Sequence, residues 1–452
     1  MTEDIDTPET DTTSHSLEST DEAEVEPQRA PEATSNLIAL VRLLVVLAAI
    51  VGVFVAFGLG ALLVVIVAII VMVMVHELGH FLTAKWSHMK VTEYFVGFGP
   101  RLFSVQRGET AYGIKPILAG GYVKIIGMTS LEDVDPADEP RTYRQQPFHK
   151  RIIVASAGSF MHFVMAFLLA YSVILYFGVP STNGVEVGGF VHWAGHTLNA
   201  AQRGGLHAGD EIVAVNGRSI TNPSQLTTAI NDSPGRPVTL TVQRGGRRVN
   251  LSVTPDVGHA LSNGTEVLGP YSSSGKPVGL IGITTAPVRT SEGPVRAVGT
   301  AVIDIGRVTA ATVAGLGHLF SLHGLSSLYS QVTSARAATK ASNNGTRIES
   351  IVGAVRTATQ AEQAGMINLI EVLIALNIVI GIVNMIPMLP LDGGHVAVAV
   401  YERVRTRKGR PYYRADTAKL MPVVYAFVAV LLVIVASAVF LDIAHPMANP
   451  FR

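Results

Sequence analysis

The chain has 452 residues, of which 48% are hydrophobic and only 15% are charged, whereas soluble domains average about 25% charged residues. Its 34 basic and 34 acidic residues balance, and no basic stripe alternates with aromatic residues, so nothing favours a nucleic-acid partner. Cysteine is absent, which excludes disulfides and thiolate metal ligands. Histidine, aspartate and glutamate must therefore supply any metal site, and the composition is typical of a protein that crosses a membrane several times.

The N-terminal part of the sequence predicts an acidic tail followed by two hydrophobic segments. Residues 1–36 contain eleven acidic residues against one arginine, a composition that indicates disorder. Residues 37–82 are hydrophobic over a length that exceeds one membrane span of about 20 residues. Glycines near position 58 divide this stretch, so we expect an extra span over 37–57 and a second span over 59–82. A single tilted and kinked helix is the alternative.

The motif His76-Glu77-Leu78-Gly79-His80 closes the second hydrophobic segment. Two histidines four residues apart lie on one face of a helix and can bind one zinc ion. The glutamate can then accept a proton from a water molecule whose pKa the metal lowers towards about 7. Ionisable groups are rare inside membrane spans and mark function there. We therefore interpret His76 and His80 as metal ligands and Glu77 as the catalytic base.

The segment 83–150 is polar and predicts strands before its Asp- and Glu-rich end. Strands over 102–106 and 111–118 flank a turn at Gly108, which is a hairpin signal, and 120–123 adds a further strand. A solvated hairpin is one interpretation. The other is that an edge strand captures an unwound substrate by strand addition, because a protease must reach a peptide carbonyl that a helix would shield.

Three later segments, 152–178, 367–392 and 421–441, are hydrophobic enough for membrane spans. The loops that they border, 83–150 and 393–420, carry nine and seven Lys and Arg residues, respectively. Positive charge in short loops marks the cytoplasmic side. We therefore expect these two loops to be cytoplasmic and the long intervening segment to lie outside the cell membrane.

A third metal ligand is expected because catalytic zinc usually has three protein ligands and one open position. Asp392 follows Pro387 and Pro390 at the end of a hydrophobic segment. Irregular backbone at membrane depth is tolerated only where it is buried in protein or lines a wet cavity. Taken alone, an aspartate and two glycines after prolines would indicate a turn. Paired with the histidine motif, Asp392 becomes the candidate third ligand.

The predicted outer segment begins with a pattern that resembles a PDZ core, over residues 205–217. A helix over 223–231 and a hairpin at Gly245-Gly246 complete a domain over 183–256. PDZ domains bind extended peptides or C-termini beside a sheet edge. We therefore expect a peptide or C-terminus as a partner of this domain.

Residues 257–366 are expected to form an extracytoplasmic linker of no readable role. Within it, 278–285 favours a returning strand. Residues 296–320 favour an amphipathic helix that lies on the outer membrane surface.

Together these motifs resemble the site-2 intramembrane zinc metalloproteases, of the regulator-of-sigma-E protease type and similar to actinobacterial members with one PDZ domain. The resemblance runs from about residue 60 to 450 and is carried by 76–80, 94–100, 120–124 and 384–403. It implies a polytopic α-helical membrane protein with four core spans, a cytoplasmic-side β-hairpin and an extracytoplasmic α+β PDZ domain. Residues 37–57 would add one more span.

The resemblance also implies a function in the cell (plasma) membrane. The protein would be a zinc-dependent endopeptidase that cleaves single-pass membrane proteins, such as anti-sigma factors, in regulated intramembrane proteolysis. The lipid bilayer would surround the reaction. Asn384 stands where the family has an asparagine that contacts the substrate carbonyl, so we assign it to substrate binding.

Two other functions stay open. In the first, the protein is a non-catalytic membrane adaptor whose PDZ domain binds partners while the metal site is structural; Glu77 argues against this, because a structural site has no use for a base. In the second, a zinc protease processes soluble peptides at the membrane face. The position of Asp392 on a distant hydrophobic segment argues against that alternative.

The sequence departs from the family pattern in its N-terminal extension and at residues 157–162, where Ala-Gly-Ser-Phe-Met-His replaces A-G-P-x-x-N. His162 is interpreted as a core polar contact, with a hydrogen bond near the site as the alternative. His395 is interpreted as a neighbour of the site and not a ligand, and Glu371 as a headgroup contact. Seven further histidines are interpreted as structural or solvated: His88, His149, His192, His196, His207, His318 and His323.

Overall fold

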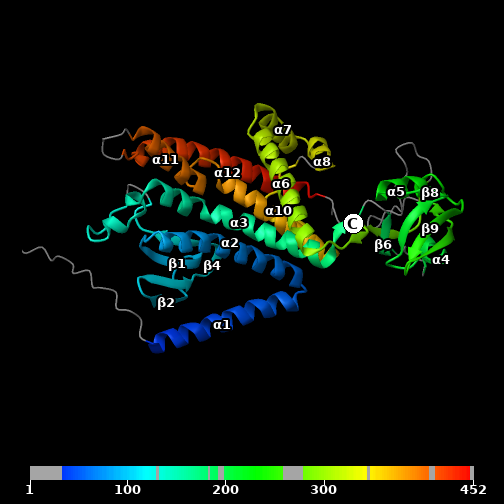
Figure 1. Cartoon of the computed structure of the whole chain (residues 1–452), viewed down its shortest axis with the longest axis horizontal. Helices are drawn as coiled ribbons and strands as arrows, with labels where there is room; N and C mark the ends of the chain where they lie inside the picture. The colour runs from blue at the N-terminus through cyan, green and yellow to red at the C-terminus, as the bar shows by residue number, and fades with distance from the viewer. Residues whose placement is uncertain are drawn as a thin grey trace, which may run out of the picture.

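The computed structural model describes residues 33–128, 132–181, 184–191, 198–257, 278–343, 347–406 and 413–447. Long helices form a bundle, a small sheet lies along one side of it, and a separate β-domain stands beyond one end (Figure 1). Nearly all of the predicted acidic tail, residues 1–32, lies outside the described residues, as do His192 and His196.

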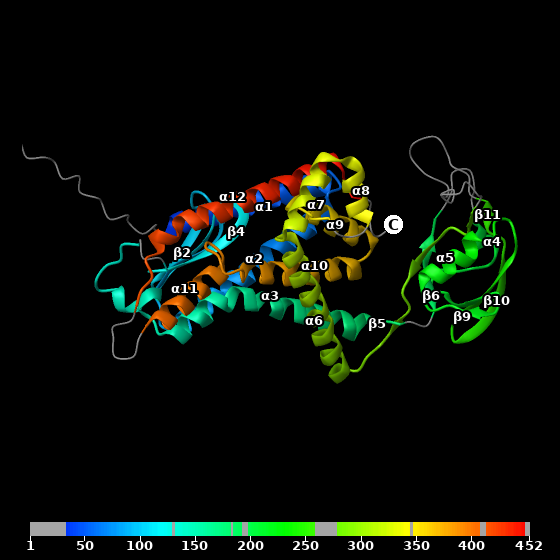
Figure 2. The ribbon, with the colours of Figure 1, turned by 90° about the horizontal axis from the view of Figure 1, so that it is seen from above.

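Five helices among the described residues are long and apolar enough to cross a membrane, which confirms a polytopic helical protein. Four of them match the four predicted core spans. The fifth, α6, is the segment predicted to be amphipathic, and both views show it running across α3 and α10 instead of along them (Figures 1 and 2). The five are α2 (Gly60–Trp86), α3 (Phe148–Phe177), α6 (Pro294–Leu319), α10 (Met366–Asn384) and α12 (Met421–Ala444).

The first hydrophobic stretch forms two helices, as expected, and not one kinked helix. α1 (Ala33–Ala56) ends before Gly58, whose φ of 68° reverses the chain at little steric cost. α2 then begins at Gly60. Where its side chains are described without a gap, α1 contains an apolar helix over Leu44–Ala56. A membrane crossing by α1 stays a prediction.

Close backbone contact joins α2 to α3 at the level of the histidine motif. A Cβ atom on Gly79 would lie 2.7 Å from the Ala157 carbonyl oxygen, so only glycine permits this approach. α10 packs on the same two helices through a hydrophobic cluster that includes Val65, Met72 and Leu369. The histidine motif thus lies inside a three-helix core and does not face lipid alone.

The hydrophobic segment predicted over 367–392 is interrupted before Asp392. α10 ends at Asn384, two prolines follow, and α11 (Asp392–Arg405) starts a new helix. Proline lacks the N–H that a continuing helix needs, which accounts for the break. Asp392 is therefore the first residue of α11 and not the last residue of a span. Residues 393–405 of the segment predicted as the loop 393–420 therefore belong to α11.

The predicted hairpin region forms a four-stranded sheet of order β2-β3-β1-β4. β1 pairs in parallel with β3, and the other neighbours are antiparallel. The strand predicted over 102–106 corresponds to β2. The single strand predicted over 111–118 is divided between β3 and the start of β4, and the strand predicted over 120–123 lies within β4. β1 precedes them as a central strand of the sheet. β4 lies at one edge of the sheet, beside α2. The strands are β1 (Val91–Phe98), β2 (Phe103–Arg107), β3 (Thr110–Ile114) and β4 (Ile117–Ile125).

The separate β-domain, called the distal domain here, contains a sheet of order β10-β9-β7-β6-β13, with β8 paired to β7. The predicted helix is present as α5 (Pro223–Asn231), begun by the Asn222 side chain, which accepts a hydrogen bond from the Gln225 N–H. The hairpin at Gly245-Gly246 joins β9 to β10. The strands are β6 (Val185–Phe190), β7 (Glu211–Val215), β8 (Arg218–Ser219), β9 (Val238–Arg244), β10 (Arg247–Val253) and β13 (Ile283–Ala286).

The distal domain continues beyond the predicted boundary at residue 256. β13 overlaps the segment 278–285 that was expected to return as a strand, and it pairs antiparallel with β6. β11 (Asp256–Val257) also pairs with β12 (Gly279–Leu280). Residues on both sides of 258–277 therefore contribute strands to the domain.

Three shorter helices connect α6 to α10. α7 (Leu322–Thr333) and α8 (Ala335–Asn343) pack against α12 through Leu328, Ala338 and Leu441. α9 (Ile351–Ala364) leads into α10. The chain thus returns to the bundle after the distal domain by way of α6 and these helices.

Candidate metal centre

Three predicted metal ligands meet between α2 and α11. His76, His80 and Asp392 each offer one ligand atom within 4.8 Å of the others. The Asp392 Oδ2 atom lies 3.5 Å from His76 Nε2 and 3.4 Å from His80 Nε2, and the two Nε2 atoms are 3.3 Å apart. Residues separated by more than 300 positions in the sequence therefore form one cluster.

The spacing of these atoms fits a single tetrahedral ion. Ligand atoms at about 2.0–2.1 Å from a tetrahedral zinc ion stand about 3.3–3.4 Å apart. Two imidazole nitrogens and one carboxylate oxygen also match the three-ligand sets of catalytic zinc sites, which leave the fourth position open. The donor atoms and their spacing therefore both fit one zinc ion.

The ring of His80 is held in its orientation by the neighbouring helix. Its Nδ1–H donates to the Val154 carbonyl oxygen of α3 over 2.7 Å. A hydrogen bond to the remote ring nitrogen fixes the tautomer that presents Nε2 to a metal. α3 thus supplies an outer contact to a predicted ligand on α2.

Gly158 of α3 makes room for both histidine rings. A Cβ atom on this residue would lie 2.3 Å from His80 Nε2 and 2.4 Å from His76 Cε1, so every other residue type would invade the cluster. The adjacent Ser159 hydroxyl donates to Asp392 Oδ2 over 3.4 Å. In the sequence, Gly158 and Ser159 were noted only as members of the segment 157–162, which departs from the family pattern, and no role was predicted for either.

Glu77 lies between α2 and the edge strand β4. A Cβ atom on Gly121 of β4 would stand 3.3 Å from the Glu77 Cγ, which places the glutamate against the strand. Glu77 is adjacent in sequence to His76, on the helix that carries both imidazoles. The carboxylate is therefore situated between the metal-ligand cluster and the sheet.

Comparison with known proteins gives this cluster its context. The sequence model of Peptidase family M50 matches residues 64–431. The chain belongs to this family. The match includes both histidines and Asp392, and it makes the protein a metalloendopeptidase, as predicted.

Curated relatives of this M50 peptidase agree over nearly their whole length. The zinc metalloprotease Rip1 of Mycolicibacterium smegmatis is 32% identical over 425 residues, which cover 87% of this chain and 98% of the relative. The zinc metalloprotease Rip1 of Mycobacterium tuberculosis is 31% identical over 409 residues, which cover 84% of this chain and 95% of the relative. Both relatives are named as zinc enzymes, and zinc is the metal that two imidazoles and one carboxylate fit.

His162 lies beside the cluster of this M50 peptidase without joining it. Its ring centroid is 5.0 Å from that of His76, and its Nδ1 forms a 3.0 Å hydrogen bond with Asn377 Oδ1. Both residues are almost fully buried. The sequence had missed Asn377, although a lone amide inside the hydrophobic run of α10 was a signal that a buried partner exists.

The remaining predicted residues lie around the site. Asn384 is half-buried at the end of α10, just before the break that leads to Asp392. His395 packs against Tyr143, with ring centroids 6.2 Å apart, and is not part of the ligand cluster. Glu371, expected to meet headgroups, accepts a hydrogen bond from Arg289 over 2.7 Å.

An ion cluster fixes the sheet to the end of α2. Lys85 and Arg141 both donate to Glu109 of the β2–β3 turn, over 2.6 Å and 2.9 Å. The hydrogen bond from Arg141, together with that from Lys85, lowers the pKa of Glu109 to about 2. The sheet that faces Glu77 is therefore anchored to the helix that carries Glu77.

Proposed function

We propose that this M50 peptidase is a zinc-dependent intramembrane endopeptidase that cleaves single-pass membrane proteins, such as anti-sigma factors. The observation that carries the proposal is the meeting of His76, His80 and Asp392 where apolar helices come together. The relatives' names state zinc, and the ligand spacing fits that ion. A site in this position favours substrates that are themselves embedded in a membrane.

The proposed chemistry divides between the metal and Glu77. Zinc, when bound, supplies a Lewis acid that polarises the peptide carbonyl and makes water a better nucleophile at neutral pH. Glu77 accepts the proton that the attacking water loses and returns it to the leaving amine. Asn384 donates its side-chain amide to the substrate carbonyl near the site. Gly158 keeps the space above the imidazoles open.

The edge strand β4 is the proposed binding site for the unwound substrate. Among the described strands, β4 pairs only with β1, so no strand occupies its other edge. An extended segment can add to such an edge through main-chain hydrogen bonds. Because Gly121 of β4 lies against Glu77, a peptide added here would run close to the base.

The distal domain is proposed to be a PDZ domain that binds a peptide or C-terminus and so controls access to the site. The order of its strands places β13 at an edge of the sheet. The Lys and Arg residues of the loops 83–150 and 393–420 favour a cytoplasmic position for the sheet and an extracytoplasmic one for the distal domain. Cleavage would then release the cytoplasmic part of the substrate.

Co-expression with reporter substrates tests this function. The wild-type chain, Glu77→Gln and the control Glu362→Gln on α9 are each expressed with a panel of single-span anti-sigma-factor-like reporters whose outer domains are truncated. We expect the wild type and the control to produce a fragment cut within the span, located by mass spectrometry. Glu77→Gln should lower its rate by about 10²–10⁴-fold. Equal processing by Glu77→Gln would exclude the mechanism and favour the adaptor alternative.

A further inference from the structure

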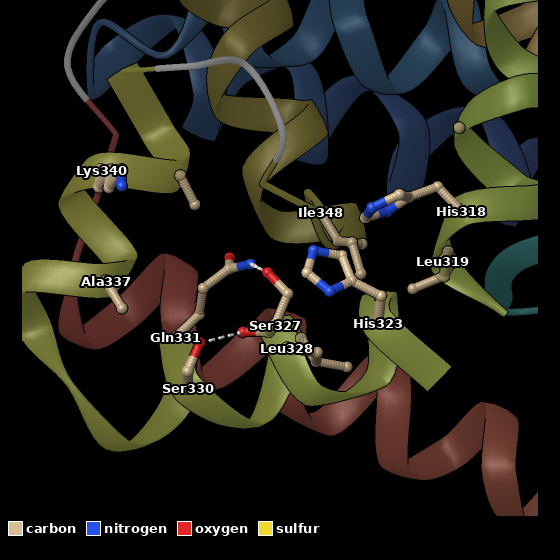
Figure 3. Close-up of a pocket in the computed structure, with 13 residues that line it drawn as sticks. His318, Leu319, His323, Ser327, Leu328, Ser330, Gln331, Ala337, Lys340 and Ile348 are labelled. Atoms are coloured by element: carbon tan, nitrogen blue, oxygen red, sulfur yellow. Dashed lines mark hydrogen bonds between the residues drawn. The ribbon is translucent and has the colours of Figure 1, made fainter. Parts of the chain in front are cut away.

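A hollow lined by both polar and apolar side chains lies between α6, α7 and α8 (Figure 3). It has a volume of about 480 Å³. Among its lining residues are His318 of α6, His323 and Gln331 of α7, and Lys340 of α8. Neither the proposed cleavage reaction nor the ligand set His76, His80 and Asp392 uses any of them.

A tight corner between two helices brings the two histidines together. Their ring centroids are 5.5 Å apart with an interplanar angle of 83°, close to the 4.9 Å and 77° between His76 and His80. Gly324 permits the corner, because a Cβ atom there would lie 2.0 Å from the His318 carbonyl oxygen. His318 and His323 were interpreted as structural or solvated from their spacing alone. They are five positions apart, and a spacing of five is not a recognised pattern for metal ligands. The break between α6 and α7 brings them together all the same.

Gln331 supplies a buried oxygen without a partner. The residue is 4% exposed, and its Nε2 donates to the Ser327 hydroxyl over 3.2 Å. Its Oε1 is buried and accepts no hydrogen bond from the part of the chain that the structure describes. His323, Ser327 and Gln331 follow one another at four-residue intervals and so share one face of α7. Figure 3 shows the carboxamide of Gln331 and the ring of His323 directed into the same hollow.

We propose that this hollow binds a divalent transition-metal ion through His318, His323 and the Oε1 atom of Gln331, with water in the remaining positions. A buried acceptor that lacks a donor is costly, and a cation relieves it. Imidazole nitrogens are common ligands of zinc and copper, and carbonyl oxygen completes such sites. An anion is disfavoured here, because the partial negative charge of the unpartnered Gln331 Oε1 atom would repel it. Lys340 is exposed, so water screens its charge.

Zinc binding by the full chain tests the site. The protein is purified in detergent with an affinity tag free of histidine, in a His76→Ala/His80→Ala background that removes the first cluster. Equilibrium dialysis against zinc should find one equivalent bound. Adding His318→Asn or His323→Asn should weaken this binding by at least about tenfold, the lower bound for losing even an outer-shell partner of a metal ligand. His149→Asn/His207→Asn, two other exposed histidines, is the control and should retain the equivalent.

The side chains of His318 and His323 are exposed, so their replacement by asparagine should leave the fold intact. Copper(II) bound to the same background should show nitrogen couplings from two imidazoles by electron paramagnetic resonance, and His318→Asn/His323→Asn should remove them. The proposal is overturned if the background binds no zinc. It is equally overturned if the control and the His318→Asn/His323→Asn variant bind zinc alike, or if the copper spectrum is unchanged by that pair of substitutions.

Discussion

Arg151 of α3 and Glu402 of α11 form an ion pair in which the Nη1 and Oε2 atoms are 2.5 Å apart, with both side chains at most 6% exposed. Glu402 also accepts a hydrogen bond from the Ala415 N–H over 2.8 Å. α11 begins with Asp392, and α3 carries Gly158. The pair therefore ties the helix that carries the proposed third ligand to the helix whose Gly158 faces both imidazoles.

Breaking this pair should destabilise the protein and loosen the site. Arg151→Ala or Glu402→Ala removes one side of this buried ion pair, which costs about 3–5 kcal/mol. We expect lower unfolding midpoints in detergent and reduced zinc content. The double variant Arg151→Met/Glu402→Leu should cost less than either single change, because it removes both charges. A double variant less stable than both single variants would contradict this account.

Each proposed ligand should be required for zinc binding. His76→Ala, His80→Ala and Asp392→Ala each remove one of three protein ligands, and a catalytic site has no spare one. Elemental analysis at fixed free zinc should show a lower zinc content at the first site in each variant, with His318→Asn/His323→Asn as the common background. His395→Ala is the control, since its ring lies against Tyr143. Full zinc content in Asp392→Ala would show that Asp392 is not the third ligand and that another residue has that role.

Gly158→Ala should weaken zinc binding although it changes no ligand. The added methyl group would overlap the space of both imidazoles, so at least one ring must turn away. We expect an affinity loss of at least about tenfold, as for disrupted outer-shell contacts. Ser156→Ala, on the same helix, should bind zinc as the wild type does. Unchanged binding by Gly158→Ala would show that α3 can shift without cost.

The distal domain should lose stability in acid through Asp210. This residue is almost fully buried and accepts two hydrogen bonds of 2.6 Å from Arg244 and one of 2.8 Å from the His207 N–H. Burial opposes the charged form, but the bonds from Arg244 and His207 outweigh it and lower the pKa of Asp210. The carboxylate therefore stabilises the fold above the ordinary pKa of about 3.9, and this contribution falls as the pH drops below that value.

Hydrogen exchange of the full chain, corrected for intrinsic rates, checks the effect of Asp210. Protection of residues 205–244 should decrease between pH 5 and pH 3 more in the wild type than in Asp210→Asn. At neutral pH, Asp210→Asn should reduce protection, because a neutral amide accepts weaker hydrogen bonds from Arg244 than a carboxylate does. Parallel pH profiles for the two proteins would exclude Asp210 as the responsible group.

Introduced cysteines should report the two sides of the membrane. The chain has no cysteine, so a single one is labelled without background. Ser219→Cys in the distal domain and Gln106→Cys in β2 both replace exposed residues. An impermeant thiol reagent applied to intact cells should label the first, and the second only after permeabilisation. The inverse result would place the metal-ligand cluster near the outer face.

Local patterns in the sequence determined the parts of this protein whose geometry depends on near neighbours. Hydropathy located four core spans because a helix must be apolar along its length to sit in lipid. The i, i+4 spacing placed His76 and His80 on one helical face whatever surrounds the helix. The helix predicted over 223–231 is present as α5 for a similar local reason, since its capping residue, Asn222, directly precedes it.

Only the tertiary structure decided the features that join distant segments. No local pattern predicted that Asp392 would begin a new helix beside His80. None predicted that Gly158 would face both imidazoles, or that Asn377 would form a hydrogen bond with His162. β13 joined the distal domain across a long gap, and a corner at Gly324 brought His318 to His323. Such contacts depend on how whole helices and strands pack, and packing sums many weak interactions that no short sequence window contains.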